Sequence, residues 1–94
     1  MRLVFSDRAE VDLEEIGDYI ALDNPLRAMS FIAELRSACA RLSVFPEAAP
    51  LRPDLGEGIR GQPHGRYLIF YRVADGALRI ERILQGNRLF PDPD

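Results

Sequence analysis

A short break between two helical patterns constrains the fold of this chain more than any other feature of its sequence. Asn24 is a strong N-cap, and Pro25 suits the first position of a helix because its missing N–H would be unpaired there. Because the break is so short, we expect the two helices to form an antiparallel hairpin. The apolar residues at helical spacing are Ala9, Leu13, Ile16 and Ile20 before the break, and Ala28, Phe31, Ile32, Leu35, Ala38, Cys39, Leu42 and Phe45 after it.

The start of the first helix carries capping signals. Residues 2–6 have the composition of a short strand, and either Ser6 or Asp7 can cap the helix that follows. Asp7 and Glu10 match the D-x-x-E form of a capping box. We expect the helix to end near Asp23, with its exposed face covered by acids.

The second half of the chain has the pattern of strands. Residues 46–58 hold three prolines and two glycines and are expected to form a surface loop. A short strand over 59–62, a central strand over 66–73 and a return strand over 77–84 follow, with Asp75-Gly76 as a tight turn. The sequence therefore predicts an α+β fold. It consists of an N-terminal strand, a two-helix hairpin and a three-stranded antiparallel meander, with the helices packed on one face of the sheet. We expect one domain over 1–94, with a flexible tail from about residue 89.

The segment "GEGIRG", with Gly56, Gly58 and Gly61, matches the G-x-G-x-x-G spacing of dinucleotide-binding turns. In such turns the glycines join a strand to a helix, whose N-terminal amides hold the pyrophosphate. Here they follow a proline-rich loop and lead into a strand. We therefore expect them to bend the chain into an edge strand and to bind no nucleotide cofactor.

Few side chains offer catalytic chemistry. His64 is the only histidine and is expected in an exposed turn, whereas Cys39 lies on the apolar stripe of the second helix and is expected in the core. The chain has no lysine, so no lysine amine is available as a nucleophile or base. No metal-ligand spacing appears, and we predict no metal, no cofactor and no catalytic residue.

The charges divide unevenly along the chain. The net charge is −3, yet residues 58–91 carry six arginines against Asp75 and Glu81. These arginines are either solvated strand ends or a surface that recognises phosphates or carboxylates. An acidic chain is not typical of a general nucleic-acid binder, and no apolar run is long enough to span a bilayer. We expect a cytoplasmic protein that makes no membrane contact and no sequence-specific contact with nucleic acid by itself.

Three segments together resemble a known family. They are "AEVDLEEIGDYIALDNPLRAMSFIAEL", the strand "GRYLIFYRV", and "RIERIL" followed by a glycine two residues before an arginine. The chain is similar over residues 2–88 to the ParE toxins of the RelE/ParE superfamily, the toxins of type II toxin–antitoxin modules. The resemblance implies neutralisation by a ParD-like antitoxin and a part in plasmid stabilisation. It also implies inhibition of DNA gyrase by stabilising its cleaved-DNA complex.

RelE-like members of the superfamily instead cut messenger RNA on the ribosome, and this endonuclease activity is the alternative function. A second alternative is an inactive member that serves as a binding module. Gln85 and Leu89 depart from the family pattern, which usually has histidine and aspartate there. The resemblance and the arginine pattern together predict these partner-binding residues: Arg60, Arg66, Tyr71, Arg72, Arg82, Arg88 and Phe90.

Overall fold

The computed structural model of the chain describes residues 1–86 and has the predicted order of elements. Phe90 and Arg88 lie outside this range, as does the tail expected from about residue 89. Within residues 1–86, neither helix is long and apolar enough to cross a membrane. The elements are β1 (Arg2–Phe5), α1 (Asp7–Ala21), α2 (Pro25–Val44), β2 (Arg60–His64), β3 (Tyr67–Ala74) and β4 (Ala77–Gln85).

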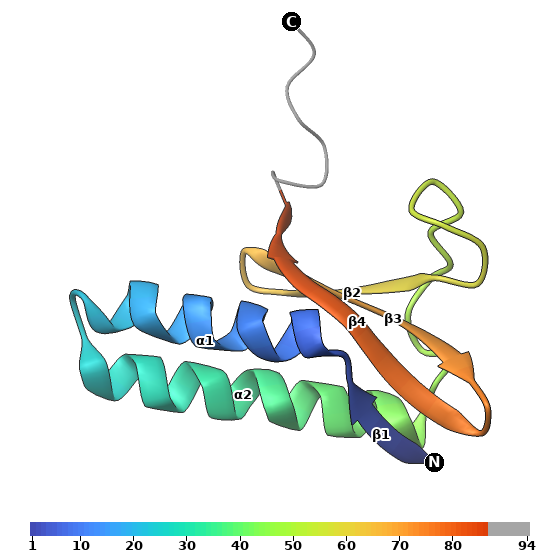
Figure 1. Cartoon of the computed structure of the whole chain (residues 1–94), viewed down its shortest axis with the longest axis horizontal. Helices are drawn as coiled ribbons and strands as arrows, with labels where there is room; N and C mark the ends of the chain where they lie inside the picture. Colours follow the sequence, from blue (N-terminus) through green and yellow to red (C-terminus); the bar gives the residue numbers. More distant parts are fainter. Residues whose placement is uncertain (87–94) are drawn as a thin grey trace, which may run out of the picture.

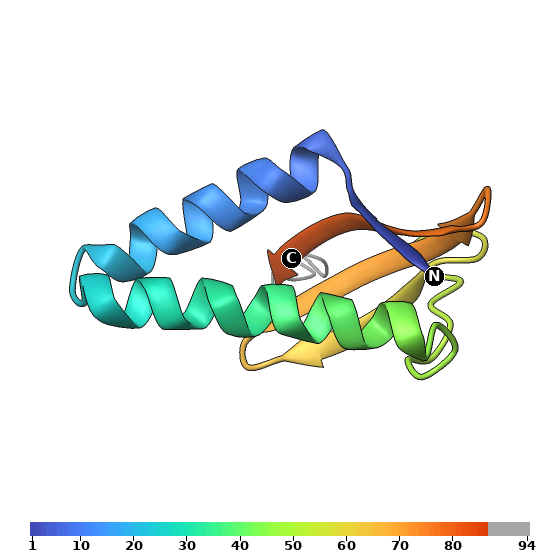
Figure 2. The same ribbon diagram turned by 90° about the horizontal axis from the view of Figure 1, so that it is seen from below.

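The strands form one sheet in the order β1-β4-β3-β2. The meander β2-β3-β4 is antiparallel, as predicted, and β1 pairs in parallel with the first half of β4, from Arg2↔Ala77 to Phe5↔Ile80. Figures 1 and 2 show the helical hairpin covering one face of this sheet, with α1 beneath β4. The predicted α+β class is therefore confirmed.

Both helices begin with a side-chain cap. Ser6 is the N-cap of α1, and its Oγ accepts a hydrogen bond from the Ala9 N–H at 3.0 Å. The capping box predicted for Asp7 and Glu10 is therefore wrong, because the cap lies one residue earlier. The Asn24 cap is confirmed, since its Oδ1 accepts from the Arg27 N–H at 3.0 Å.

The core lies between the helical hairpin and the sheet. Phe45 was expected on the apolar stripe of α2, but it is the C-cap residue and is 67% exposed. The helix ends before it, so its side chain no longer follows the stripe. The largest side chains that are less than 2% exposed come from both layers: Leu35, Cys39, Ile69, Tyr71, Leu78, Ile80 and Ile83.

The glycine-rich segment bends the chain into β2. Gly56 and Gly58 have φ values of 144° and 75°, which side-chain-bearing residues rarely adopt. The segment leads directly into β2, which is the last strand of the sheet. Gly61 lies within β2, where a Cβ would approach Arg52 Cγ at 3.2 Å. The glycines thus shape an edge strand and lead into no helix, as the sequence predicted.

Candidate functional site

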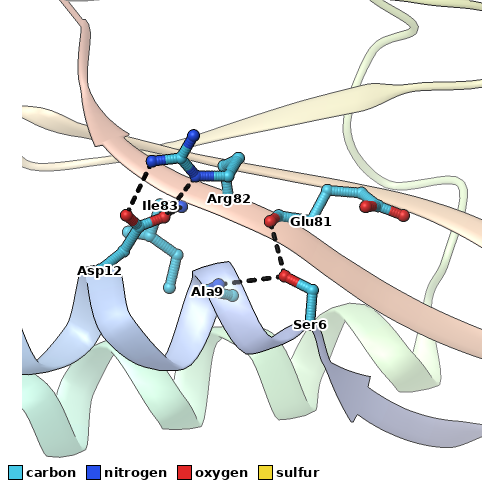
Figure 3. A network of polar contacts seen from close by, with 6 residues as sticks. All are labelled: Ser6, Ala9, Asp12, Glu81, Arg82 and Ile83. Carbon is cyan, nitrogen blue, oxygen red and sulfur yellow. Dashed lines mark hydrogen bonds and ion pairs between the residues drawn. The ribbon is translucent and has the colours of Figure 1, made fainter.

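Asp12 and Arg82 form the most buried ion pair of the described residues. Asp12 is 3% exposed and lies on the face of α1 turned toward β4. Its carboxylate accepts from Arg82 Nε at 2.8 Å and Nη2 at 2.9 Å, and also from the Ile83 backbone N–H at 3.0 Å (Figure 3). The hydrogen bond to Asp12 raises the pKa of Arg82. The Arg82 side chain therefore holds α1 against the sheet.

The start of α1 completes the edge of β4. β1 pairs with β4 only as far as Ile80. Beyond that point the Ser6 Oγ donates to the Glu81 carbonyl at 2.8 Å, and Asp12 accepts from the N–H of Ile83. Side chains of α1 and its cap thus replace the missing strand, because backbone groups that are buried need partners.

Arg60 and Tyr71 hold the loop before β2. They face each other across β2 and β3. Arg60 donates to the Ala49 carbonyl at 2.7 Å, and the Tyr71 hydroxyl donates to the Pro46 carbonyl at 2.9 Å. Tyr71 is 0% exposed, and burial raises its pKa. The prediction that the Tyr71 side chain contacts a partner is therefore corrected, because that side chain lies in the core.

Arg72, Arg79 and Glu81 form an exposed cluster, which we call the arginine triad. Arg72 on β3 lies directly opposite Arg79 on β4. Their Nε atoms lie 3.3 and 3.1 Å from Glu81 Oε1. A register shift between Phe70 and Tyr71 leaves Glu81 as an extra residue of β4, since Tyr71 pairs with Ile80 and Phe70 with Arg82. The bulge thus places a carboxylate between two guanidinium groups.

The remaining predicted residues are not brought together. Arg66 is exposed in the turn between β2 and β3, where its carbonyl accepts from the Gly86 N–H at 3.0 Å. Of the seven predicted partner-binding residues, only Arg66 and Arg72 are therefore described with an exposed side chain. Arg88 and Phe90 lie outside the described residues and stay predictions.

A cavity of about 320 Å³ lies between α1 and the C-terminal end of β4. It opens beside the Asp12–Arg82 pair. Its polar lining is acidic or neutral, and within the described part of the chain no guanidinium lines it. The lining residues are Asp12, Glu15, Ile16, Tyr19, Tyr67, Ile83, Leu84 and Gln85.

The two side chains considered for catalysis, His64 and Cys39, pack against other residues of the fold. His64 ends β2 and is half-buried against the ring of Phe31 at a centroid distance of 5.7 Å, so the expectation of an exposed turn histidine is wrong. Cys39 is buried in the core as expected, and this burial raises its pKa to about 12. Among residues 1–86, no group of three His, Cys, Asp or Glu side chains could hold a metal ion.

The predicted site residues do not include Asp12, Arg79 or Glu81. Asp12 did carry a signal, because it lies three residues after Ala9 and four before Ile16 and so falls on the apolar side of α1. An acid there must find a partner. Glu81 carried no comparable signal, since a bulge cannot be located from strand alternation alone.

Comparisons with known proteins agree with this architecture. The family model described as the ParE toxin of the type II toxin–antitoxin system parDE matches residues 3–90. Toxin RelE2 of Caulobacter vibrioides is 37% identical over 89 residues, which are 94% of this chain and 98% of that protein.

Solved structures are similar as well. A chain of the chromosomal ParDE TA system from P. aeruginosa has a TM-score of 0.77 and 26% identity, covering 90% of this chain and 95% of that one. YafQ from E. coli strain BL21(DE3) shares the fold, with a TM-score of 0.61, 19% identity, and coverage of 96% and 99%.

The helical hairpin, the four-stranded sheet and these relatives define a toxin of the type II toxin–antitoxin class in the RelE/ParE superfamily. Within that class, the chain belongs to the ParE toxin family.

Proposed function

We propose that this toxin inhibits DNA gyrase by protein–protein contact and is neutralised by a ParD-like antitoxin. The match to the ParE family and the likeness to a chain of a ParDE system support both parts of the proposal. Gyrase acts on DNA inside the cell, so the proposal also places the toxin in the cytoplasm.

One observation favours inhibition by protein contact rather than by catalysis. Four described side chains with acid–base, nucleophilic or cationic groups are held within the fold. Tyr71 and Cys39 are buried, His64 packs on Phe31, and Arg82 is paired with Asp12. Proton transfer to or from a substrate needs a side chain that reaches the substrate. Binding needs only an accessible surface, and Arg66 and Arg72 provide one.

A supercoiling assay tests the proposed target. Purified toxin, freed of antitoxin, is added in increasing amounts to gyrase and relaxed plasmid. We expect supercoiling to stop and cleaved DNA to accumulate. The double variant Arg66→Glu/Arg72→Glu should weaken inhibition, whereas Arg36→Gln, on an exposed helix face, should not. Normal supercoiling at a large excess of folded toxin would refute gyrase as the target.

The alternative function is ribosome-dependent cleavage of messenger RNA. The likeness to the Caulobacter relative named Toxin RelE2 supports this alternative. The matched assay incubates the toxin with programmed ribosomes and maps 5′ ends of the message. Cleavage there, combined with unaffected gyrase, would make the toxin an enzyme. Normal growth on expression without antitoxin would instead indicate the inactive binding module.

The antitoxin part of the proposal is tested by complex formation. Arg60 and Arg82 are predicted partner-binding residues, but the side chains of both have partners within the toxin. We therefore expect charge reversal at Arg72 to weaken the antitoxin complex of a folded toxin. Reversal at Arg82 should act through loss of toxin stability. Isothermal titration with a ParD-like antitoxin that binds the toxin measures the first effect, and thermal unfolding of the toxin alone measures the second.

A further inference from the structure

We propose that the arginine triad is a docking site for one carboxylate of an acidic protein segment. The proposal rests on the contact function proposed above. It adds which chemical group of the partner binds at the arginine triad. The triad lies on the sheet face turned away from the helices. Tyr71 and Ile80 are buried against the helical side, so Arg72 and Arg79, which are adjacent to them along the strands, point to the other face.

The pairing of the two arginines is unfavourable by itself. Like charges directly opposite each other on neighbouring strands destabilise a sheet. Glu81 offsets part of this repulsion, because its carboxylate oxygen lies 3.3 Å from Arg72 Nε and 3.1 Å from Arg79 Nε. Bulges are frequent beside binding sites, where they redirect a side chain. A sheet built only for stability would gain from a neutral residue at either arginine position.

The triad retains positive charge after this internal pairing. Two guanidinium groups and one carboxylate leave one net positive charge. The side chains of Arg72 and Arg79 are 44% and 48% exposed, and the shortest contact of each with Glu81 is from Nε. Within residues 1–86, neither arginine forms an ion pair with a second acid, and neither donates a hydrogen bond from its Nη atoms. Guanidinium Nη groups bind carboxylates in a planar, bidentate geometry, so one further carboxylate fits the site.

Charge complementarity favours a protein segment over nucleic acid. The whole chain carries a net charge of −3, and the acids concentrate on the helical hairpin. One residual positive charge balances one acidic side chain. A nucleic acid would bring many phosphates to an acidic protein, whereas domains that bind nucleic acid usually present a larger basic surface. Phe70 lies two residues before Arg72 on the same face and is half-buried, which gives the segment an apolar neighbour.

Nuclear magnetic resonance of the arginine side chains tests the site directly. Toxin labelled with ¹⁵N is titrated with an acetylated hexaglutamate peptide, and the Nε–Hε signals are followed. We expect saturable shifts at Arg72 and Arg79 and little change at Arg36, which pairs with Glu10 on the helical side. An oligothymidylate of equal charge is titrated in parallel and should bind more weakly.

Two variants sharpen the test. Arg79→Gln should weaken peptide binding about tenfold, the loss expected when one charged hydrogen-bonding partner is removed. Glu81→Gln should strengthen it several-fold, because the internal competitor is removed and the site carries two positive charges. Arg36→Gln is the matched control and should bind the peptide like the wild type. Far-UV circular dichroism and thermal midpoints establish that each variant is folded.

The proposal fails if the peptide shifts all arginines alike, if Glu81→Gln weakens binding, or if the oligothymidylate binds more tightly and displaces the peptide. The peptide titration contains no gyrase, so it is independent of the target assignment. Specific peptide binding with unaffected gyrase would refute the target and keep the docking site. Gyrase inhibition without peptide binding would refute the docking site and keep gyrase as the target.

Discussion

Asp12 on the first helix and Arg82 on the last strand are 70 residues apart in sequence, and they form a two-point ion pair with oxygen–nitrogen distances of 2.8 and 2.9 Å. The same carboxylate accepts the N–H of Ile83. Three interactions therefore converge on one buried side chain. This pair fixes the position of α1 relative to the second half of β4, along which β1 does not extend.

We predict that Asp12→Ala lowers the free energy of unfolding by about 3 kcal/mol, because it leaves Arg82 and a backbone N–H without their partner. Urea denaturation followed by circular dichroism measures the change. Glu14→Ala, an exposed acid on the same helix, should change stability by less than about 0.5 kcal/mol. In a double-mutant cycle with Arg82→Met, the coupling should exceed about 1 kcal/mol, and additive losses would contradict the pairing.

Removing the loop anchors should free residues 46–58 without unfolding the sheet. Tyr71→Phe deletes the hydrogen bond to Pro46, and Arg60→Met deletes the one to Ala49. We expect each to cost about 1 kcal/mol and to speed hydrogen exchange of the loop amides while β3 and β4 stay protected. Arg66→Met, which removes an exposed turn side chain, should leave the exchange pattern unchanged.

The thiol of Cys39 should be unreactive in the folded toxin. Burial raises its pKa from 9.0 to about 12, although the nearby Arg36 opposes the shift. At pH 8 we expect an aromatic disulfide reagent to react slowly with the native protein and rapidly in urea. Fast labelling of the native protein would place the thiol at the surface.

The same shift predicts that stability falls in alkali. The folded pKa lies above the unfolded value, so its contribution is complete below pH 9 and is lost as the pH rises from 9 toward 12. The raised pKa of Tyr71 acts in the same direction. Urea midpoints between pH 7 and 11 should therefore decline above pH 9, and less steeply for Cys39→Ala.

Two glycines should respond oppositely to substitution by alanine. Gly17 lies inside α1, where a Cβ would meet Ile32 Cγ1 at an ordinary 3.5 Å, so Gly17→Ala should stabilise by up to about 1 kcal/mol. Gly76 has a φ of 73° in the β3–β4 turn, so Gly76→Ala should destabilise by about 1 kcal/mol or more. Thermal unfolding of both variants measures the contrast, and equal signs would contradict it.

The sequence predicted most of the fold because its signals are local. The Asn24-Pro25 restart, the Asp75-Gly76 turn and the helical stripes without Phe45 each act within a few residues, and each has its expected place. The parallel pairing of β1 with β4 was not predicted, since it joins residues about 75 apart and depends on the packing of the hairpin.

The candidate site was harder to predict than the fold. The fact that a residue is an arginine does not show which groups its side chain contacts. Arg60 and Arg82 bind groups within the toxin, whereas Arg72 remains exposed beside Arg79. These assignments depend on a bulge at Glu81 and on a carboxylate from a distant helix, and neither follows from strand alternation.

The placement of β1 against β4 also bears on how the toxin is made. Among the described strands, β1 pairs with β4 alone, at residues 77–80. During synthesis β1 therefore cannot join the sheet until nearly the whole described chain has emerged from the ribosome. Until then the helical hairpin exists without the sheet that covers its apolar side. A nascent chain that has not yet reached residue 80 therefore lacks the partner that β1 needs to join the sheet.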